Sequence, residues 1–289
     1  MTDAVKKIEE LAKKALQRSK EQREQGKSKS EGSVVTLPIW PASTRGTPNA
    51  FLRGALFSAI QGKERRALTG ELLASQKGLT IRYTGITLDQ CDLDVWEAAV
   101  QIAHGHPLGN VCQFQINGFL KLLGRKNSGT EHAWLKDSLR RLMAAGVEIS
   151  DGHYSYGGSM LEWWHDIDND TYQLKLNPRI LALYKAGWTQ IEWKIRQDLK
   201  RKPLALWVHG WLSSNTENFP TKLETVRKLS GSINKQKAGF KRHLQKALTD
   251  LVAVGAINDF KVEDDLVHIL REPTRAQRRH IAKTSKKPV

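Results

Sequence analysis

The sequence is poor in cysteine. Cys91 and Cys112 are its two cysteines; they do not form a Cys-x-x-Cys pair, and no histidine stands at zinc-ligand spacing from them. Neither a disulfide framework nor a structural zinc is therefore expected to hold the fold together. We expect both side chains to be reduced thiols.

Long apolar runs are also missing. A membrane-spanning helix needs a run of about 18 or more apolar residues, and the sequence has none. The N-terminus, MTDAVKKIEELAKK, lacks the apolar core of a signal peptide. We therefore expect a cytoplasmic protein with no membrane partner.

Acidic residues are in the minority. Against 30 Asp and Glu stand 46 Lys and Arg, and the net charge is +16. An excess of this size indicates a polyanionic partner, above all nucleic acid. The length, 289 residues, suggests about two domains.

Motifs for metal or nucleotide chemistry are incomplete. His104 and His106 form a His-x-His pair, but glycine separates them where a helix ends, whereas nicking enzymes place an apolar residue between two such histidines on a strand. The run HDIDND starts like a calcium loop, yet Thr171 and Asn177 occupy the positions of its glycine and glutamate. Gly26-Lys27-Ser28 lacks the first glycine of a phosphate-binding loop. We predict no catalytic, cofactor or metal residues, and a binding protein rather than an enzyme.

What the sequence does contain is a strongly patterned stretch from Asn127 to Ile149. Its apolar residues recur at helical spacing, at Leu135, Leu139, Leu142 and Ala145, while Lys136 and Arg140 are neighbours on another face. One face can be buried and another can meet a polyanion. Ser128 and Glu131 fit a capping box, and Gly146 is expected to end the helix in the left-handed conformation before a strand at Val147–Ile149.

The pattern occurs a second time between Lys235 and Phe260. Leu244, Leu248, Leu251 and Gly255 repeat Leu135, Leu139, Leu142 and Gly146, all at an offset of 109 residues. A short apolar helix ending in glycine precedes each copy, at Phe119–Gly124 and Val226–Gly231. We interpret the two stretches as copies of one module. The alternative is that any two amphipathic helices align on their leucines.

These patterns predict an α+β protein with two tandem winged-helix domains. The predicted divisions are a flexible amphipathic helix and linker at 1–33, winged-helix domain 1 at 34–186, winged-helix domain 2 at 187–272, and a disordered basic tail at 273–289. Elsewhere we expect a hairpin in 79–88 with its turn at Gly85, a helix at 93–105, and a long helical region from Trp188 that breaks at Pro203.

The two long helices are the candidate DNA readers. An α-helix fits the major groove, where its first residues read base edges while basic side chains hold phosphates. The alternative is that each basic run is only a solvated helix face. The candidate residues are Arg125, Lys126, Ser128, His132, Lys136 and Arg140 in the first copy, and Lys235, Gln236, Lys237, Lys241, Arg242 and Lys246 in the second.

Several segments, taken in order, resemble the TrfA-type plasmid replication initiators. The similarity covers roughly Trp40 to Leu270 and includes IRYTGITL, DLDVWEAAVQIAHGHPLGN, FLKLLGRKNSGTEHAWLKDSLRRL and AINDFKVEDDLVHI. Its most specific marks are Tyr83-Thr84-Gly85, Val95-Trp96, His106-Pro107-Leu108-Gly109 and Asp264-Asp265-Leu266-Val267-His268.

The resemblance implies an origin-binding initiator with two winged-helix domains. It implies binding to iteron repeats, opening of the nearby duplex, recruitment of the replicative helicase, with the host initiator as a second candidate partner, and a homodimer in equilibrium with an active monomer. Some members contact the sliding clamp through a glutamine-led apolar peptide; the matching segment here, SVVTLPIWP, lacks the glutamine, so clamp contact is not expected. Two alternatives remain open. One is a winged-helix transcriptional repressor, and the other is a rolling-circle nicking initiator that uses His104, His106 and Tyr154.

Overall fold

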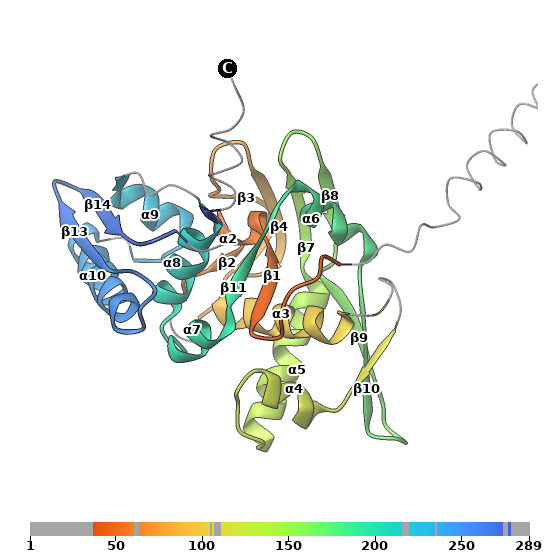
Figure 1. Ribbon diagram of the computed structural model, residues 1–289. Coiled ribbons are helices and arrows are strands. Elements are labelled where there is room, and N and C mark those ends of the chain that lie inside the picture. The colour runs from red at the N-terminus through yellow and green to blue at the C-terminus, as the bar shows by residue number, and fades with distance from the viewer. Residues whose placement is uncertain are drawn as a thin grey trace, which may run out of the picture. The chain divides into compact units, whose positions relative to one another are not determined.

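The structure is a computed structural model, and it describes residues 37–60, 64–104, 106, 111–215, 220–234, 236–273 and 277–278. The chain divides into two compact units, Met1–Val35 and Thr36–Val289, and only the second contains described residues. The helix and linker predicted at 1–33, candidate residue Lys235 and most of the tail predicted at 273–289 lie outside them. Within the described residues helices and strands are mixed, which confirms the α+β class (Figure 1).

One order of elements occurs twice, namely a helix, a short strand, two further helices and an antiparallel hairpin, and in the first copy two more strands (146–150 and 155–158) are inserted before the hairpin. The short strand pairs with the last strand in both copies, giving sheets β6-β10-β9 and β12-β14-β13. The first copy consists of α3 (Gln90–Ala103), β6 (Cys112–Phe114), α4 (Ile116–Leu122), α5 (Gly129–Ala144), β9 (Leu161–Asp166) and β10 (Thr171–Leu176). The second consists of α8 (Pro203–Ser214), β12 (Thr221–Lys222), α9 (Leu223–Leu229), α10 (Lys237–Ala253), β13 (Asp259–Glu263) and β14 (Leu266–Leu270).

The other elements mostly surround the first copy. A four-stranded antiparallel sheet has the order β3-β4-β7-β8, β1 pairs antiparallel with β11, and β2 pairs parallel with β5. Their bounds are β1 (Thr44–Pro48), α2 (Asn49–Leu52), β2 (Phe57–Ser58), β3 (Ala67–Leu73), β4 (Thr80–Ile86), β5 (Leu88–Asp89), β7 (Gly146–Ser150), β8 (Ser155–Gly158), η1 (Pro178–Ile180), α6 (Leu181–Ala186), β11 (Trp188–Glu192) and α7 (Trp193–Asp198).

The leucine register of the two long helices is confirmed. Leu135, Leu139 and Leu142 of α5 are buried, and so are their counterparts in α10. Burial of a leucine side chain contributes roughly 2 kcal/mol, so each stripe fixes its helix on the core. The short helices α4 and α9 are each followed by a left-handed glycine, Gly124 at φ +61° and Gly231 at φ +62°.

The ends of the long helices differ from each other. Gly255 has φ +71° and ends α10 as predicted, but Gly146 is not left-handed. The chain leaves α5 through Ala145 in an extended conformation, and Gly146 opens strand β7 opposite Thr84. The prediction for Gly146 was therefore wrong, because a neighbouring strand was available to pair with it at once.

Strand assignments needed three further corrections. Gly85 lies inside the continuous strand β4, whose hairpin partner is β3 rather than the segment after Gly85. The strand at Val147–Ile149 is confirmed, but the β7-β8 hairpin that it forms joins β4, whereas the separate β9-β10 hairpin pairs with β6. Trp188–Glu192 is a strand rather than a helix, since β1 offers it a full antiparallel register. Pro203 does break the helical region, as the first residue of α8.

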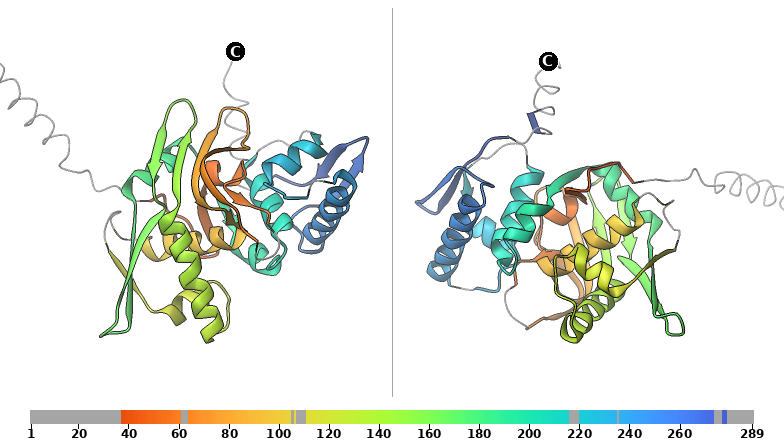
Figure 2. Two further views of the ribbon diagram at one scale, coloured as in Figure 1. Left: turned by 180° about the vertical axis from the view of Figure 1, so that it is seen from behind. Right: turned by 60° about the horizontal axis from the view of Figure 1, so that its bottom comes forward.

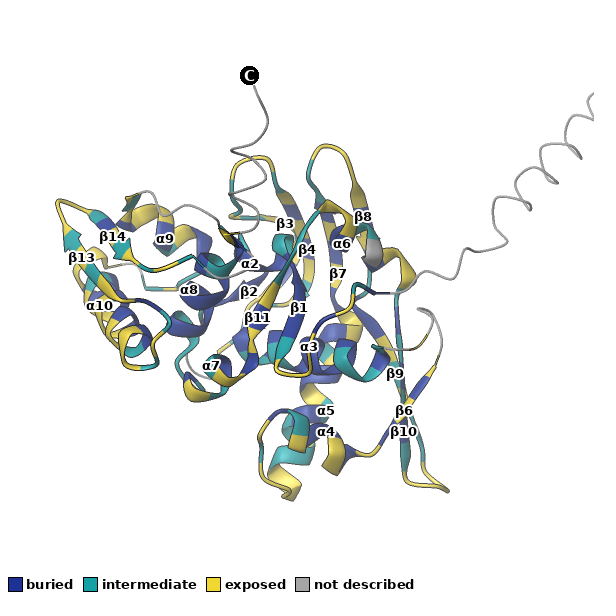
Figure 3. Ribbon diagram, viewed as in Figure 1, coloured by how far each residue is buried: buried dark blue, intermediate teal, exposed yellow. Residues whose placement is uncertain are grey.

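Two hydrophobic cores hold these elements together. One core runs from Leu37 to Trp193 and the other from Leu199 to Val267, so the chain passes between them at α7 and the turn after it. Figure 3 shows α8 and β1 as largely buried, with exposed residues along the outer sides of α10 and α5. Across the described ranges no helix is both long and apolar enough to cross a bilayer.

Candidate nucleic-acid interface

The side of α5 that faces away from the core carries few uncompensated positive charges. Arg140 is exposed, but its Nη1 lies 2.7 Å from Oδ1 of Asp137 one turn earlier, which is equally exposed. Lys136 is only half-exposed, with its Nζ 5.5 Å from the ring centre of Tyr172 in β10. The Lys136 side chain therefore points toward the β9-β10 hairpin, and the Arg140 side chain is paired with Asp137.

The first turn of α5 gathers uncharged hydrogen-bonding groups. Ser128 is the N-cap, and its Oγ accepts from the backbone N–H of Glu131 at 3.4 Å. The Nε2 of His132 lies 3.1 Å from Oδ1 of Asn117 and 2.6 Å from Oδ1 of Asn127. Imidazole, amide and hydroxyl groups at the start of a helix are the kind that read base edges.

Arg125 is held inside the protein. Its Nη1 donates to Oε2 of Glu131 at 2.6 Å, and its guanidinium carbon lies 3.4 Å from the ring centre of Trp134. The capping box is therefore only half formed, because the Glu131 side chain pairs with Arg125. Lys126, next along the chain, is exposed.

The outward side of α10 is more basic. Arg242 and Lys246 are exposed one turn apart, opposite the buried stripe, while Lys241 is half-exposed at the edge of that stripe. Gln236 is the exposed N-cap residue, and Lys237 in the first turn forms an ion pair with Asp265 in the β13-β14 turn.

The two helices differ in charge at positions that correspond at the offset of 109 residues. Where α10 has Arg242 and Lys246, α5 has Ala133 and Asp137. The outward face of α10 is thus the more basic of the two, whereas the start of α5 has more amide, hydroxyl and imidazole groups.

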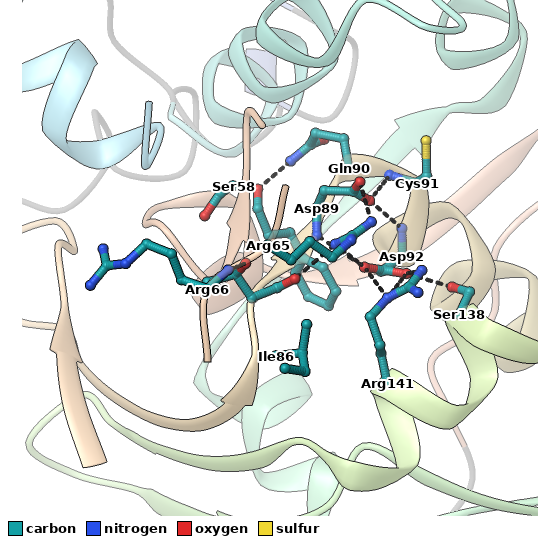
Figure 4. Close-up of polar contacts among 12 residues, drawn as sticks. Ser58, Arg65, Arg66, Ile86, Asp89, Gln90, Cys91, Asp92, Ser138 and Arg141 are labelled. Atoms are coloured by element: carbon teal, nitrogen blue, oxygen red, sulfur yellow. Dashed lines mark hydrogen bonds and ion pairs between the residues drawn. The ribbon is translucent and has the colours of Figure 1, made fainter. Parts of the chain in front are cut away.

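A buried ionic network, which sequence reasoning missed, fixes α5 against α3 (Figure 4). The fully buried carboxylate of Asp92 accepts from Arg65 Nη1 at 3.0 Å, Arg141 Nη2 at 2.7 Å and Ser138 Oγ at 2.6 Å. Asp92 also completes a capping box with Asp89 at the start of α3. Burial, followed by the negative charge of Asp92, raises the pKa of Asp89. The Asp-x-x-Asp spacing was the one sequence signal for this site.

A second buried network attaches α7 to α3. The guanidinium of Arg196 is almost completely buried; its Nε lies 2.7 Å from Oδ1 of Asp94 and 3.6 Å from Oε2 of Glu97. Glu97 also accepts a hydrogen bond from Oγ1 of Thr47 at 2.6 Å. Since Thr47 belongs to β1, this strand is connected to the network as well. Burial is the main cause that raises the pKa of Glu97. These contacts set the position of the chain where it enters the second core.

Several residues of the incomplete metal and nicking motifs, and the cysteine Cys91, lie among the described residues, where they have structural roles. The ring of His104 packs against Trp40 at a tilt of 35°, with ring centres 4.4 Å apart, and its Nε2 lies 3.1 Å from the Pro38 carbonyl oxygen. Asp166 accepts from the backbone and side chain of Asn169 and so forms the β9-β10 turn. Burial raises the pKa of Cys91 to about 12, which keeps this thiol protonated. Among the described residues no group of three or more His, Cys, Asp or Glu could hold a metal ion.

Known structures match this fold at low identity. Domains 2 and 3 of RctB match with a TM-score of 0.51 and 16% identity, over 74% of this chain and 88% of that one. The Pi initiator protein in complex with iteron DNA matches with a TM-score of 0.49 and 11% identity, over 81% of this chain and 100% of that one. The RctB match indicates a shared fold for most of the chain.

Sequence comparison identifies the family. The plasmid replication initiator protein TrfA of Escherichia coli is 27% identical over 250 residues, which are 83% of this chain and 65% of that protein. The chain therefore matches less than two thirds of its relative's length. The family description "TrfA protein" matches residues 2–271. Because this match spans nearly the whole sequence, the chain belongs to the TrfA family.

Proposed function

We propose that the protein initiates plasmid replication by binding iteron repeats at a plasmid origin. The observation that carries the proposal is the repeated order of elements, which puts α5 and α10 at equivalent places in two modules of one chain of the TrfA family. The net charge of +16 supports a polyanionic partner.

Each module is proposed to be a winged-helix domain. The third helix, α5 or α10, would be the recognition helix, and the hairpins β9-β10 and β13-β14 would be the wings. Two unlike readers in one chain suit an asymmetric site, with α10 gripping phosphates through Arg242 and Lys246 and α5 reading bases near His132. The divisions at 34–186 and 187–272 belong to this proposal, with the difference that β11 and Trp193 pack with the first core and the second core begins at Leu199.

Further steps of initiation form the finer part of the proposal. We propose that binding promotes opening of an adjacent AT-rich duplex, that the bound protein recruits the replicative helicase, with or without the host initiator, and that a homodimer exchanges with the monomer that acts at the origin. The support for these steps is membership in the family.

Binding and replication assays test the proposal together. The protein should bind tandem repeats from its own replicon more tightly than scrambled duplex of the same length at physiological salt. Equal affinity for both would refute sequence-specific origin binding.

A second assay separates an initiator from a repressor. A plasmid that carries the repeats and an AT-rich segment should replicate when the protein is supplied in trans. Specific binding without replication would favour the repressor, and a covalent protein–DNA adduct after strand cleavage would favour a nicking enzyme.

A further inference from the structure

The segment that joins the two cores carries three consecutive basic residues, Lys200, Arg201 and Lys202. The Nζ of Lys200 donates to the carbonyl oxygen of Gly124, in the turn before α5, at 2.5 Å. The Nζ of Lys202 lies 2.8 Å from Oδ1 of Asp250 in α10. One end of the segment is thus tied to the first module's long helix region and the other to the second module's. Figures 1 and 2 show α7, which leads into this segment, between α10 and the α4-α5 region.

Arg201 lies between the two lysines and has a left-handed backbone conformation. Its side chain is not engaged with the rest of the described protein. Its φ is +65°, a left-handed conformation that is unfavourable for any residue with a Cβ atom. The side chain is exposed and makes no hydrogen bond or ion pair with any residue that the structure describes. A glycine would relieve the backbone, so the turn maintains an arginine at a conformational cost.

Positive charge is concentrated around Arg201. Partial burial, then the nearby charge of Arg125, lowers the pKa of Lys200, and Arg201 adds to this effect. The acidic groups close by are already paired, Glu131 with Arg125 and Asp250 with Lys202. Helix α8 begins directly afterwards with no side-chain cap and no acidic residue in its first turn, so the positive end of its dipole is uncompensated.

A hollow of about 840 Å³ continues from Arg201 along the side of α10. The polar side chains that line it with Arg201 include Asn234, Gln236, His243 and Lys246. Arg201 therefore shares a groove with basic and amide side chains at the helix proposed to hold DNA; the acidic residue in its lining, Asp250, is paired with Lys202, and the rest of the lining is mostly apolar.

We infer that Arg201, supported by Lys200, contacts backbone phosphates of duplex DNA between the sites of the two recognition helices. This inference rests on the proposed function. Two helices of one chain that read successive major grooves on one face of B-DNA lie about 34 Å apart, and the groove between them is the minor groove. A segment tied to both helix regions faces the sugar–phosphate strands that border it. Arg201 is then a third DNA contact, independent of α5 and α10.

The test measures affinity for iteron duplex as a function of salt. Each phosphate contact contributes about 0.9 to the slope of log affinity against log salt. Arg201→Ala keeps the same backbone strain and should lower the slope by about 0.9, on iteron and scrambled duplex alike. Arg179→Ala, which removes an exposed arginine of η1 outside this segment, is the matched control and should leave the slope unchanged.

Two further variants separate binding from folding. Arg201→Lys should retain the slope, because it retains the charge. Arg201→Gly should raise the melting temperature and still show the same decrease in the salt slope of DNA binding as Arg201→Ala. If the arginine had only a structural role, DNA binding would be unchanged in the Arg201→Gly variant. A slope for Arg201→Ala equal to that of wild type and Arg179→Ala would overturn the inference, as would a loss confined to certain base sequences.

Failure of the inference is distinguishable from failure of the proposed function. If wild type prefers iterons over scrambled DNA while Arg201→Ala behaves as wild type, only the Arg201 contact is refuted. If wild type shows no preference for iterons, the proposed function is refuted whatever the variant does.

Discussion

Arg141 of α5 donates through Nη2 to the buried Oδ1 of Asp92 in α3, at 2.7 Å. Arg65 binds the other oxygen of the same carboxylate from the loop before β3. One buried negative charge thus joins three segments that are distant in the sequence, and it determines where α5 sits on the core. The orientation of the face of α5 that we propose reads DNA depends on this carboxylate.

Asp92→Asn should therefore destabilise the protein strongly. The asparagine keeps the shape but leaves the largely buried guanidinium of Arg141 without its anion and Arg65 with Asp89 alone, a loss of about 3 kcal/mol in the free energy of unfolding. Urea denaturation measures it. Asp137→Asn, which breaks an exposed ion pair on the same helix, is the control and should cost only a few tenths, roughly 0.3 kcal/mol. Equal effects of the two substitutions would contradict the importance of the network.

The sequence was sufficient to predict the long helices but not this network. Leucine spacing, the Ser128 cap and the left-handed Gly255 are local signals, and each was read correctly. Arg141 and Arg65 gave no signal, because their partner is 49 and 27 residues away and a charged residue is most often solvated. Ionic contacts between distant segments cannot be read from periodicity.

Strand partners were the other gap in prediction. Trp188–Glu192 adjoins residues of helical character, and only the presence of β1 beside it makes it a strand. Gly85 marks a turn in most contexts, yet here β4 runs through it between β3 and β7. For the candidate interface, the sequence predicted the two long helices that the structure contains, and their role in DNA binding stays a prediction; the pairing of Arg140 with Asp137 and of Arg125 with Glu131 could not be read from the sequence.

The two glycines that follow the long helices should respond differently to alanine. Gly255→Ala should lower the free energy of unfolding by about 1 kcal/mol, because Gly255 is left-handed. Apart from its chain neighbours, no heavy atom of the residues that the structure describes lies within 4 Å of the added Cβ, so the loss is conformational. Gly146→Ala should be nearly neutral, since Gly146 is extended and its Cβ would sit 3.5 Å from that of Thr84. Chemical denaturation of both variants checks this, and equal losses would contradict it.

Acidification should destabilise the protein through His209. Burial, then the charges of Arg196 and Arg271, lowers the pKa of this imidazole to about 3. Below the unfolded-state pKa near 6.5, His209 binds a proton in the unfolded chain but stays neutral in the folded protein, so the free energy of unfolding decreases as pH falls. Between pH 7 and pH 5 the expected loss from this group is about 2 kcal/mol.

His209→Gln isolates that contribution. The difference in unfolding free energy between wild type and variant should change by about 2 kcal/mol over this pH range, while carboxylates common to both cancel. Urea midpoints at the two pH values measure the change. Parallel pH profiles would show that the histidine is not kept neutral.

Neutralising Asp137, the exposed acidic residue of α5, should strengthen DNA binding. Asp137→Asn frees the guanidinium of Arg140, whose Nη1 now lies 2.7 Å from the Asp137 carboxylate. The salt slope of binding should rise by up to about 0.9, with affinity higher on iteron and scrambled duplex alike. Arg140→Ala in the same background should abolish the gain. No gain from Asp137→Asn would place this side of α5 away from phosphate.

Base readout should depend on His132 rather than on the basic side chains. Its Nε2 is oriented by the side-chain oxygens of Asn117 and Asn127 at the start of α5, where a recognition helix meets base edges. His132→Ala should reduce the ratio of iteron to scrambled affinity by about tenfold, the effect of one lost base contact of ~1–3 kcal/mol, and leave the salt slope unchanged. Arg242→Ala should do the reverse, lowering the slope and keeping the ratio. Competition binding at two salt concentrations distinguishes them, and a His132 variant that loses slope but keeps its ratio would make His132 a phosphate contact and contradict its role in base readout.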